Sequence, residues 1–317
     1  MKAALTALLL LAWLSGAGAR AAWLRVTPAP LDGPARLFEA GRYAEVVTQL
    51  GESITRLPSN DQRQGYYYLG LSYERLGRLD KALGVYQLGV KLFPRDLNLL
   101  TQLGQLLHSS GLEEQAEPVF QKVLSIHPNN AAAHLGLAEI DHSLGFFDRG
   151  AEHYEKALEV RADSPELWRA YAEILIAARD YKTGALAARR SLSLKDDPDT
   201  LVDLARAQRA AGHLPEALDT LAEAITRFPA RADVALARSL WLLEAERYDD
   251  ALAGVAPVLA APGAPPLAYW IRARVRLKGD QYRAAVEDLK RAAAAERDAP
   301  FVAASARELL KQLGSAP

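Results

Sequence analysis

A period of about 34 residues runs through this 317-residue chain and constrains its fold more than any other feature. Small residues recur in one slot at steps of 33 or 34 residues, at Gly70, Gly104, Ala138, Ala172, Ala205, Ser239 and Ala273. A second small column follows 12 residues later in every unit, at Ala82, Ala116, Gly150, Gly184, Ala217, Ala251 and Ala285. Repetition with this period is typical of helical hairpins stacked in one dimension, because each unit buries its apolar face against its neighbours.

The stretch QGYYYLGLSYERLG shows why each unit should be a pair of helices. The first helix is predicted from apolar or small residues spaced i, i+3, i+4 and i+7, namely Tyr66, Leu69, Gly70 and Tyr73. Gly77 should end it, and Pro94 should end a second helix whose buried face holds Ala82, Tyr86 and Gly89. A glycine inside a helix costs about 1 kcal/mol relative to alanine. The expected reason for Gly70 is therefore a close approach of the two helices.

These residues resemble the tetratricopeptide repeat family, whose pattern is W-x2-L-G-x2-Y, then A-x3-F and then P. One unit carries it as Tyr66, Leu69, Gly70, Tyr73, Ala82, Tyr86 and Pro94, and the next as Leu100, Leu103, Gly104, Leu107, Ala116, Phe120 and Pro128. Later units keep the small columns but lose the proline, with Ala162, Asp196, Gly263 and Arg297 in its slot. The resemblance implies an all-α, right-handed superhelical solenoid of helix-turn-helix repeats.

The resemblance covers nearly all of the chain after its first residues and sets the predicted domain organisation. Residues 34–314 are expected to form a single solenoid of about seven full repeats after a truncated first one. A capping helix near residues 300–313 should cover the last open apolar face, as solenoids require. Residues 22–33 are predicted to be a short N-terminal extension.

The first 21 residues predict export. Lys2 precedes a mainly apolar run over residues 3–14, and small residues that fit a small-x-small cleavage site follow at Ala17, Ala19 and Ala21. The run is shorter than the roughly 20 residues of a membrane-spanning helix. We therefore expect a cleaved signal peptide over residues 1–21 and a soluble protein with no stable membrane insertion. Exported members of the family imply the bacterial periplasm, or otherwise secretion.

Composition and missing motifs exclude several classes of function. With 38 Lys and Arg against 39 Asp and Glu, the chain has no basic footprint for nucleic acid. Without cysteine it has no disulfide framework, thiolate metal site or cysteine nucleophile. The motifs GxxxxGK[ST], GxGxxG, HExxH and GxSxG are also absent. His108 and His142 share one slot in adjacent units, about 10 Å apart at normal helix packing, too far to share a metal ion. We expect no catalytic residue, no metal and no cofactor.

In the family, the first helices line a concave groove in which a protein or peptide partner binds, so the resemblance places the site there. Slots one, five and eight residues after the Tyr66 slot should face this groove. A polar part is expected from Tyr67, Glu74, Gln105, His108, Glu139, His142, Arg169, Glu173, Arg206 and Arg209. A mainly apolar part is expected from Leu236, Leu240, Leu243, Leu267, Trp270, Arg274 and Leu277.

Trp270 and Arg274 are the most informative residues of the apolar part. They lie four residues apart on a predicted helix, so the guanidinium can stack on the indole, a contact worth about 0.5–1 kcal/mol. Tryptophan and arginine are also the residues most enriched at interface hot spots. Leucines at helical spacing are, however, usually core. The sequence leaves two alternatives open: an exposed docking surface, or a face covered by the terminal helix or by tight curvature.

The sequence thus predicts a non-catalytic exported scaffold that binds a protein or peptide and helps to assemble a cell-envelope or secretion-type complex. One alternative is a glycan- or polymer-binding scaffold in polysaccharide export or cell-wall assembly. The groove residues that suit stacking and hydrogen bonding to sugars are Tyr67, Gln105, His108 and Glu139. A third interpretation is an accessory domain of an enzyme whose catalytic part lies on another chain. The oligomeric state is not specified.

Overall fold

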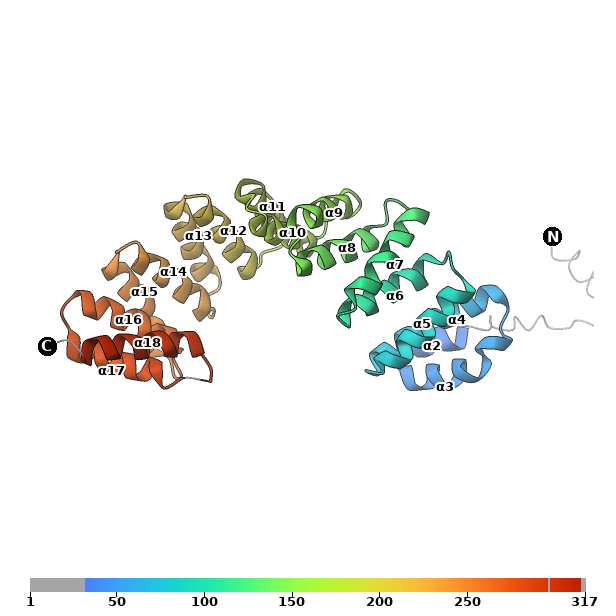
Figure 1. Cartoon of the computed structure of the whole chain (residues 1–317), viewed down its shortest axis with the longest axis horizontal. Coiled ribbons are helices and arrows are strands. Elements are labelled where there is room, and N and C mark those ends of the chain that lie inside the picture. Colours follow the sequence, from blue (N-terminus) through green and yellow to red (C-terminus); the bar gives the residue numbers. More distant parts are fainter. Residues whose placement is uncertain (1–31, 296, 315–317) are drawn as a thin grey trace, which may run out of the picture. The chain divides into compact units, whose positions relative to one another are not determined.

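The computed structural model describes residues 32–295 and 297–314, and in these ranges it has 17 α-helices, one 3-10 helix and no strand (Figure 1). The helices are α2 (Asp32–Glu39), α3 (Tyr43–Ser53), η1 (Ile54–Arg56), α4 (Ser59–Arg75), α5 (Leu79–Leu92), α6 (Leu97–Ser109), α7 (Glu113–Ile126), α8 (Ala131–Leu144), α9 (Phe147–Val160), α10 (Pro165–Ala177), α11 (Tyr181–Leu194), α12 (Pro198–Ala210), α13 (Leu214–Arg227), α14 (Ala232–Glu244), α15 (Tyr248–Ala260), α16 (Pro266–Lys278), α17 (Tyr282–Ala293) and α18 (Pro300–Gly314). The all-α fold is confirmed. The predicted signal peptide and most of the extension lie outside the described residues.

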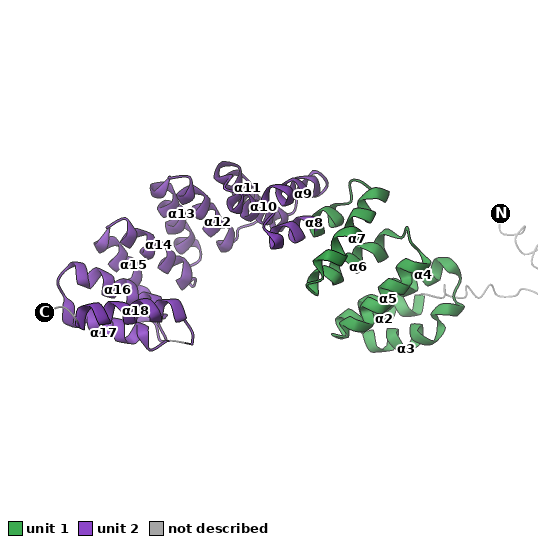
Figure 2. Ribbon diagram, viewed as in Figure 1, with its two compact units in different colours: residues 1–136 green, residues 137–317 purple. Residues whose placement is uncertain are grey.

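The helices form two compact units, residues 1–136 and residues 137–317, and the boundary falls inside α8 (Figure 2). Within each unit, consecutive helices pack against one another as antiparallel hairpins, such as α4 with α5 and α10 with α11. The even-numbered helices from α4 to α16 are the first helices of the pairs. The odd-numbered helix that follows each of them is the second helix of that pair. The face formed by the first helices of a unit is called its first-helix face below.

First helices begin at polar residues that recur with the repeat. The side chains of Asp96, Asn130, Ser164 and Asp197 accept hydrogen bonds from the backbone N–H three residues on, at 2.9, 2.9, 3.2 and 2.8 Å. Each cap satisfies an N–H group that the helix itself leaves unpaired, which is worth about 1 kcal/mol. The caps therefore help to fix where these four first helices start, whereas α4, α14 and α16 have no side-chain cap.

The turn within each hairpin needs one residue with a left-handed backbone. Glycine holds this slot in four units, with φ of 70, 71, 80 and 88° at Gly77, Gly111, Gly145 and Gly212. A residue with a side chain holds it in the other three, with φ of 65, 58 and 57° at Arg179, Glu246 and Asp280. A side chain in this conformation costs about 1–2 kcal/mol, so unit 2 carries strain at three of its turns.

Replacing Arg179 by glycine should therefore raise the free energy of unfolding of unit 2 by about 0.5–1 kcal/mol. The gain is smaller than the strain that is relieved, because glycine also increases the conformational entropy of the unfolded chain. Urea unfolding followed by circular dichroism measures the change. Arg179→Ala is the matched control, because it removes the exposed guanidinium but keeps the Cβ that causes the strain. Equal stability of the two variants would contradict the strain at this turn.

Aromatic rings explain the two glycines of the first small column, Gly70 and Gly104. A Cβ at Gly70 would lie 2.2 Å from Cε1 of Tyr86, and a Cβ at Gly104 would lie 2.7 Å from Cε1 of Phe120. Both rings are fully buried. The expected approach of two helix backbones at Gly70 is thus wrong in detail: the close contact is between the backbone of the first helix and a ring on the second. The ring needs the space that a side chain would take.

The C-terminal end of the array agrees with the prediction of a capping helix. Helix α18 closes the last hairpin as the predicted capping helix. Helix α18 packs against α16 and α17 and buries Ala303 and Ala306. No helix in the described ranges is both long enough and apolar enough to cross a membrane.

Candidate functional site

The first-helix face of unit 1 carries four of the predicted polar residues, and the structure gives one of them a structural role. Glu74 accepts a hydrogen bond from the buried hydroxyl of Tyr86, at 2.5 Å. Burial and this hydrogen bond raise the pKa of Tyr86. Gln105 is exposed and accepts a hydrogen bond from Gln102 at 3.0 Å. His108 is half-buried, with Nδ1 3.4 Å from a carboxylate oxygen of Glu113.

Tyr67 lies at a hollow of about 540 Å³ between the N-terminal parts of α4 and α6. Two cations, Arg63 and Arg95, line the hollow, and Nε of Arg63 lies 3.3 Å from the carboxylate of Asp96. The other lining residues are mainly polar or aromatic: Asn60, Gln64, Tyr68, Leu97 and Asn98. The ring of Tyr67 meets that of Tyr68 edge-on at 5.8 Å. Sequence reasoning found Tyr67 and missed its cationic neighbours, which precede the slots expected to face the groove.

In unit 2, the predicted polar residues of α8 do not converge on a site. Glu139 is exposed and His142 is half-buried. The imidazole of His142 meets the ring of Phe147 edge-on, with centroids 5.8 Å apart. In the part of the chain that the structure describes, no group of three or more His, Asp or Glu side chains could hold a metal ion.

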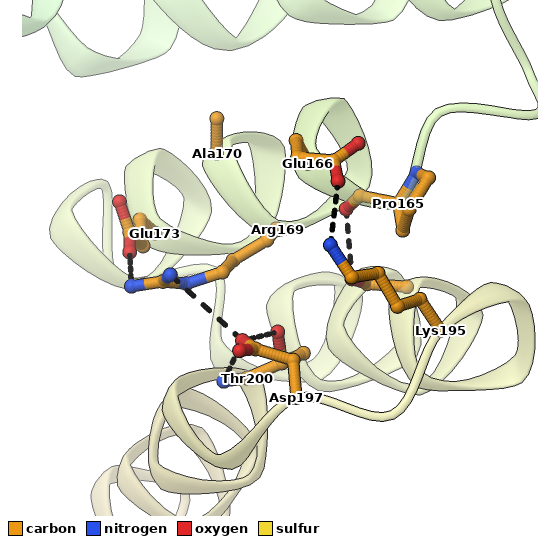
Figure 3. A pocket seen from close by; sticks show the side chains of 9 residues that line it. Pro165, Glu166, Arg169, Ala170, Glu173, Lys195, Asp197 and Thr200 are labelled. Carbon is orange, nitrogen blue, oxygen red and sulfur yellow. Dashed lines mark hydrogen bonds and ion pairs between the residues drawn. The ribbon is translucent and has the colours of Figure 1, made fainter.

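Arg169 and Glu173 of α10 lie at a polar hollow of about 310 Å³ formed with α11 and α12 (Figure 3). The Arg169 guanidinium points across the hollow toward Asp197, which directly precedes α12. The Nε of Arg169 donates to Oδ2 of Asp203 on α12 at 3.1 Å. Its Nη2 donates to Oε1 of Glu173 at 2.9 Å. Its Nη1 also lies 3.8 and 3.7 Å from the carboxylates of Asp197 and Asp199. Four carboxylates therefore surround one guanidinium.

Asp203 is the buried centre of this cluster, with its side chain only 4% exposed. Its second oxygen accepts from Nη1 of Arg206 at 3.2 Å. Burial raises the pKa of Asp203 to about 6, and the nearby carboxylate of Glu173 acts in the same direction, against the lowering effect of Arg169. The charged groups of the cluster pair with one another across α10 and α12, so the cluster is a salt-bridge network that links two repeats.

Further ion pairs between repeats connect α12 to α14. Nη2 of Arg209 donates to Glu244 at 2.5 Å, and its guanidinium lies 4.7 Å from the centroid of the Trp241 ring. Nη2 of Arg231 donates to Asp199 at 2.6 Å. Arg169, Glu173, Arg206 and Arg209, all predicted as groove residues, are thus engaged within unit 2. Sequence reasoning missed Asp203, which lies in the next repeat, 34 residues after Arg169.

The apolar part is divided between core and surface, because two of its seven predicted residues are buried and five are half-buried. Leu236 is 5% exposed and Leu243 is 8% exposed, and both belong to the main core cluster of unit 2. The remaining predicted residues are half-buried: Leu240, Leu267, Trp270, Arg274 and Leu277. The second of the two alternatives therefore holds for Leu236 and Leu243.

Trp270 is held from two sides. Its Nε1 donates to Oγ of Ser305 on the capping helix α18, at 3.2 Å. The Arg274 guanidinium lies 5.1 Å from the centroid of its ring, so the expected cation–π contact is present. The capping helix thus covers part of the indole, while Trp270 and Arg274 both keep partial exposure.

Comparisons with known proteins agree with the repeat pattern. Three sequence models described as tetratricopeptide repeat match residues 63–106, 107–174 and 202–265, together more than half of the chain. No curated protein sequence matches the chain.

Several solved structures are similar in fold. The C-terminal part of a repeat-containing protein from Cytophaga hutchinsonii has a TM-score of 0.63 at 15% identity, covering 74% of this chain and 96% of that one. A tetratricopeptide repeat protein from Parabacteroides merdae has a TM-score of 0.56 at 17% identity, with coverages of 78% and 97%. MamA from Desulfovibrio magneticus has a TM-score of 0.51 at 16% identity, with coverages of 54% and 97%. At these identities the likeness concerns the fold alone. With its period, its packed hairpins and the three sequence matches, this chain belongs to the tetratricopeptide repeat family.

Proposed function

We propose that this chain is a non-catalytic scaffold that binds a protein or peptide segment on the first-helix face of unit 2, around Trp270 and Arg274. Solenoids of this kind stack their repeats into extended binding surfaces. In the polar part of the same face, side chains such as Arg169 are already engaged in ion pairs within the unit. The half-exposed apolar part is therefore the better candidate for a partner.

The observation that carries this proposal is the fixed geometry of the Trp270–Arg274 pair. A side chain already ordered in the free protein loses little conformational entropy on binding, which favours affinity. The indole is ordered by its hydrogen bond to Ser305 and by the guanidinium above it. The rim is formed by half-buried leucines at 240, 267 and 277. This surface suits an apolar segment with a carboxylate or carbonyl group placed to accept from Arg274.

Replacing Arg274 by alanine should weaken partner binding about tenfold, since hot-spot side chains typically contribute more than 1 kcal/mol. A photo-crosslinking residue at Leu277 would first capture the partner in cells that produce the protein, and calorimetry with the identified segment would then give the affinity. Arg291→Ala is the control, because this guanidinium also stacks on a ring, that of Tyr269 at 5.5 Å, but lies on α17. Unchanged affinity in Arg274→Ala, or an equal loss in Arg291→Ala, would contradict the site.

A glycan-binding function is the second candidate, and the hollow beside Tyr67 in unit 1 supports it. Two arginines and several amides around an aromatic ring suit an acidic saccharide, because guanidinium groups bind carboxylates and amides bind hydroxyls. Tyr67→Ala should then abolish saccharide binding and leave protein capture at unit 2 unchanged. Loss of partner binding only in the Arg274 variant favours the protein-binding function.

We also propose that the protein is exported and serves a cell-envelope or secretion-type assembly. The apolar leader over residues 1–21 supports this proposal. Cell fractionation, with N-terminal sequencing of the mature protein, tests it directly. Cleavage near Ala19 or Ala21 together with recovery outside the cytoplasm is the expected result, and an intact N-terminus in the cytoplasm would contradict export.

A further inference from the structure

The solvent face of α15 differs from that of every other second helix in having no polar side chain along most of its length. From Ala251 to Ala268 the sequence contains only alanine, leucine, glycine, valine and proline. Several of these residues are exposed on α15: Leu252, Ala253, Ala256, Pro257 and Ala260. An apolar face of this length on a soluble unit marks an interaction site more often than chance exposure.

The same slots in the other repeats show that this face is not a general property of the chain. The slot of Ala256 holds Gln87, Gln121, Glu155, Arg189, Ala222 and Lys290 in the other second helices. The slot of Ala260 holds Lys91, Ser125, Glu159, Ser193, Thr226 and Ala294. The apolar character is therefore concentrated on α15.

A hollow of about 400 Å³ lies beside this face. It is lined by Leu252, Ala256, Leu259, Ala260, Arg272 and Arg276. The two arginines share one buried carboxylate, that of Asp288, which accepts from Arg272 at 2.8 and 2.7 Å and from Arg276 at 2.7 Å. Two cations against one anion leave this wall of the hollow with excess positive charge.

The first turn of α15 carries the opposite charge. Asp249 and Asp250 are both exposed there. Asp250 pairs with Arg247 at 2.6 Å, whereas Asp249 has no ion-pair partner among the described residues. One face thus offers a protruding leucine and an unpaired acid next to an apolar hollow with a positive wall.

We propose that this face docks a second copy of the chain, with the two α15 helices antiparallel about a two-fold axis near Ala256. A two-fold interface brings the same surface together twice, so the surface must complement itself. In this arrangement the partner copy's Leu252 enters the hollow beside Ala260, and its Asp249 approaches the wall that holds Arg272. The alanines allow the helices to approach closely, and no polar side chain on the apolar face is buried without a partner.

This interface does not depend on the proposed function, because it uses α15 with Arg272 and Arg276 of α16 and leaves the Trp270–Arg274 surface free. A dimer would hold two such surfaces and so gain avidity for a partner that carries repeated segments. Its failure would leave partner binding by a monomer unaffected.

The oligomeric state of the full chain tests the proposal by sedimentation velocity over a concentration series. Wild type should dimerise, and Ala256→Glu should raise the dissociation constant at least ~30-fold, because the two-fold axis brings the two new carboxylates against each other and their bulk holds the helices apart. Ala260→Glu on the same face should act in the same way. Since Ala256 and Ala260 are exposed, helix content and melting temperature should stay unchanged. Arg189→Glu, in the same slot of α11, is the matched control and should dimerise like wild type.

A cysteine at the proposed axis tests the register, since the chain has no cysteine of its own. Ala256→Cys should form an intermolecular disulfide quickly under a mild oxidant, as a two-fold axis at this residue brings the two Cα atoms within about 7 Å. Arg189→Cys should crosslink only at the slow rate of random collisions. A wild type that stays monomeric, a dimer that survives both glutamate substitutions, or equal crosslinking rates would each overturn the proposal.

Discussion

Replacing Gly70 by alanine should lower the free energy of unfolding of unit 1 by about 3 kcal/mol, the upper range for overpacking a well-packed core. The new Cβ would lie 2.2 Å from Cε1 and 2.5 Å from Cζ of Tyr86. The ring cannot move away easily, because Tyr86 is fully buried and its hydroxyl donates to Glu74 at 2.5 Å. Alanine gains about 1 kcal/mol in helix propensity over glycine, which offsets only part of this clash.

Gly84→Ala is the control with the opposite expected sign. Gly84 is an exposed glycine of α5 with no atom within 4 Å of the position of a Cβ, so alanine should stabilise unit 1 by up to about 1 kcal/mol. Urea unfolding measures both changes, and hydrogen exchange of α4 and α5 shows whether the loss is local. A Gly70→Ala protein as stable as wild type would mean that Tyr86 has room to shift.

Most of the fold was predictable from the sequence because one physical requirement repeats. A small residue at the Gly70 slot and an aromatic at the Tyr86 slot form one packing contact, and the same contact recurs at Gly104 and Phe120. A period of 34 residues with two small columns admits few folds other than stacked helical hairpins. The nature of the contact, ring against backbone, needed the structure, since the sequence shows which residues are small and not what fills the space.

The candidate site was less predictable, for two physical reasons. Leu236 and Leu243 share a helix face with the half-exposed Leu240, and only the position of the neighbouring hairpin decides which of them is covered. Arg169 occupies an expected groove slot, yet its partner Asp203 lies a repeat away in a slot expected to face a flank. Assigning each sequence slot to a helix face one at a time does not predict ion pairs between side chains of neighbouring repeats.

Asp203 should make unit 2 less stable as pH rises through about 6. Its pKa in the folded protein is raised from 3.8 to about 6, chiefly by burial. Because the folded state then holds the proton more tightly than the unfolded state, this stabilisation is fully present below pH 3.8 and is lost as pH rises through about 6. A shift of this size corresponds to about 3 kcal/mol. The facing charges are Arg169 and Glu173 from α10 and Arg206 from α12, with Asp197 and Asp199 on the far side of Arg169.

The measurement is the difference in unfolding free energy between wild type and Asp203→Asn, taken from about pH 4 to pH 8. The difference should fall by about 3 kcal/mol over this range, since asparagine does not titrate. Carboxylates with lowered pKa values, such as Asp197 and Asp233, stabilise both proteins equally as pH rises and cancel. Asp196→Asn, an exposed carboxylate paired with Arg227, is the control and should show no such fall. A difference that instead rises with pH would contradict the raised pKa. It would show that the ion pairs with Arg169 and Arg206 lower the pKa of Asp203 more than burial raises it.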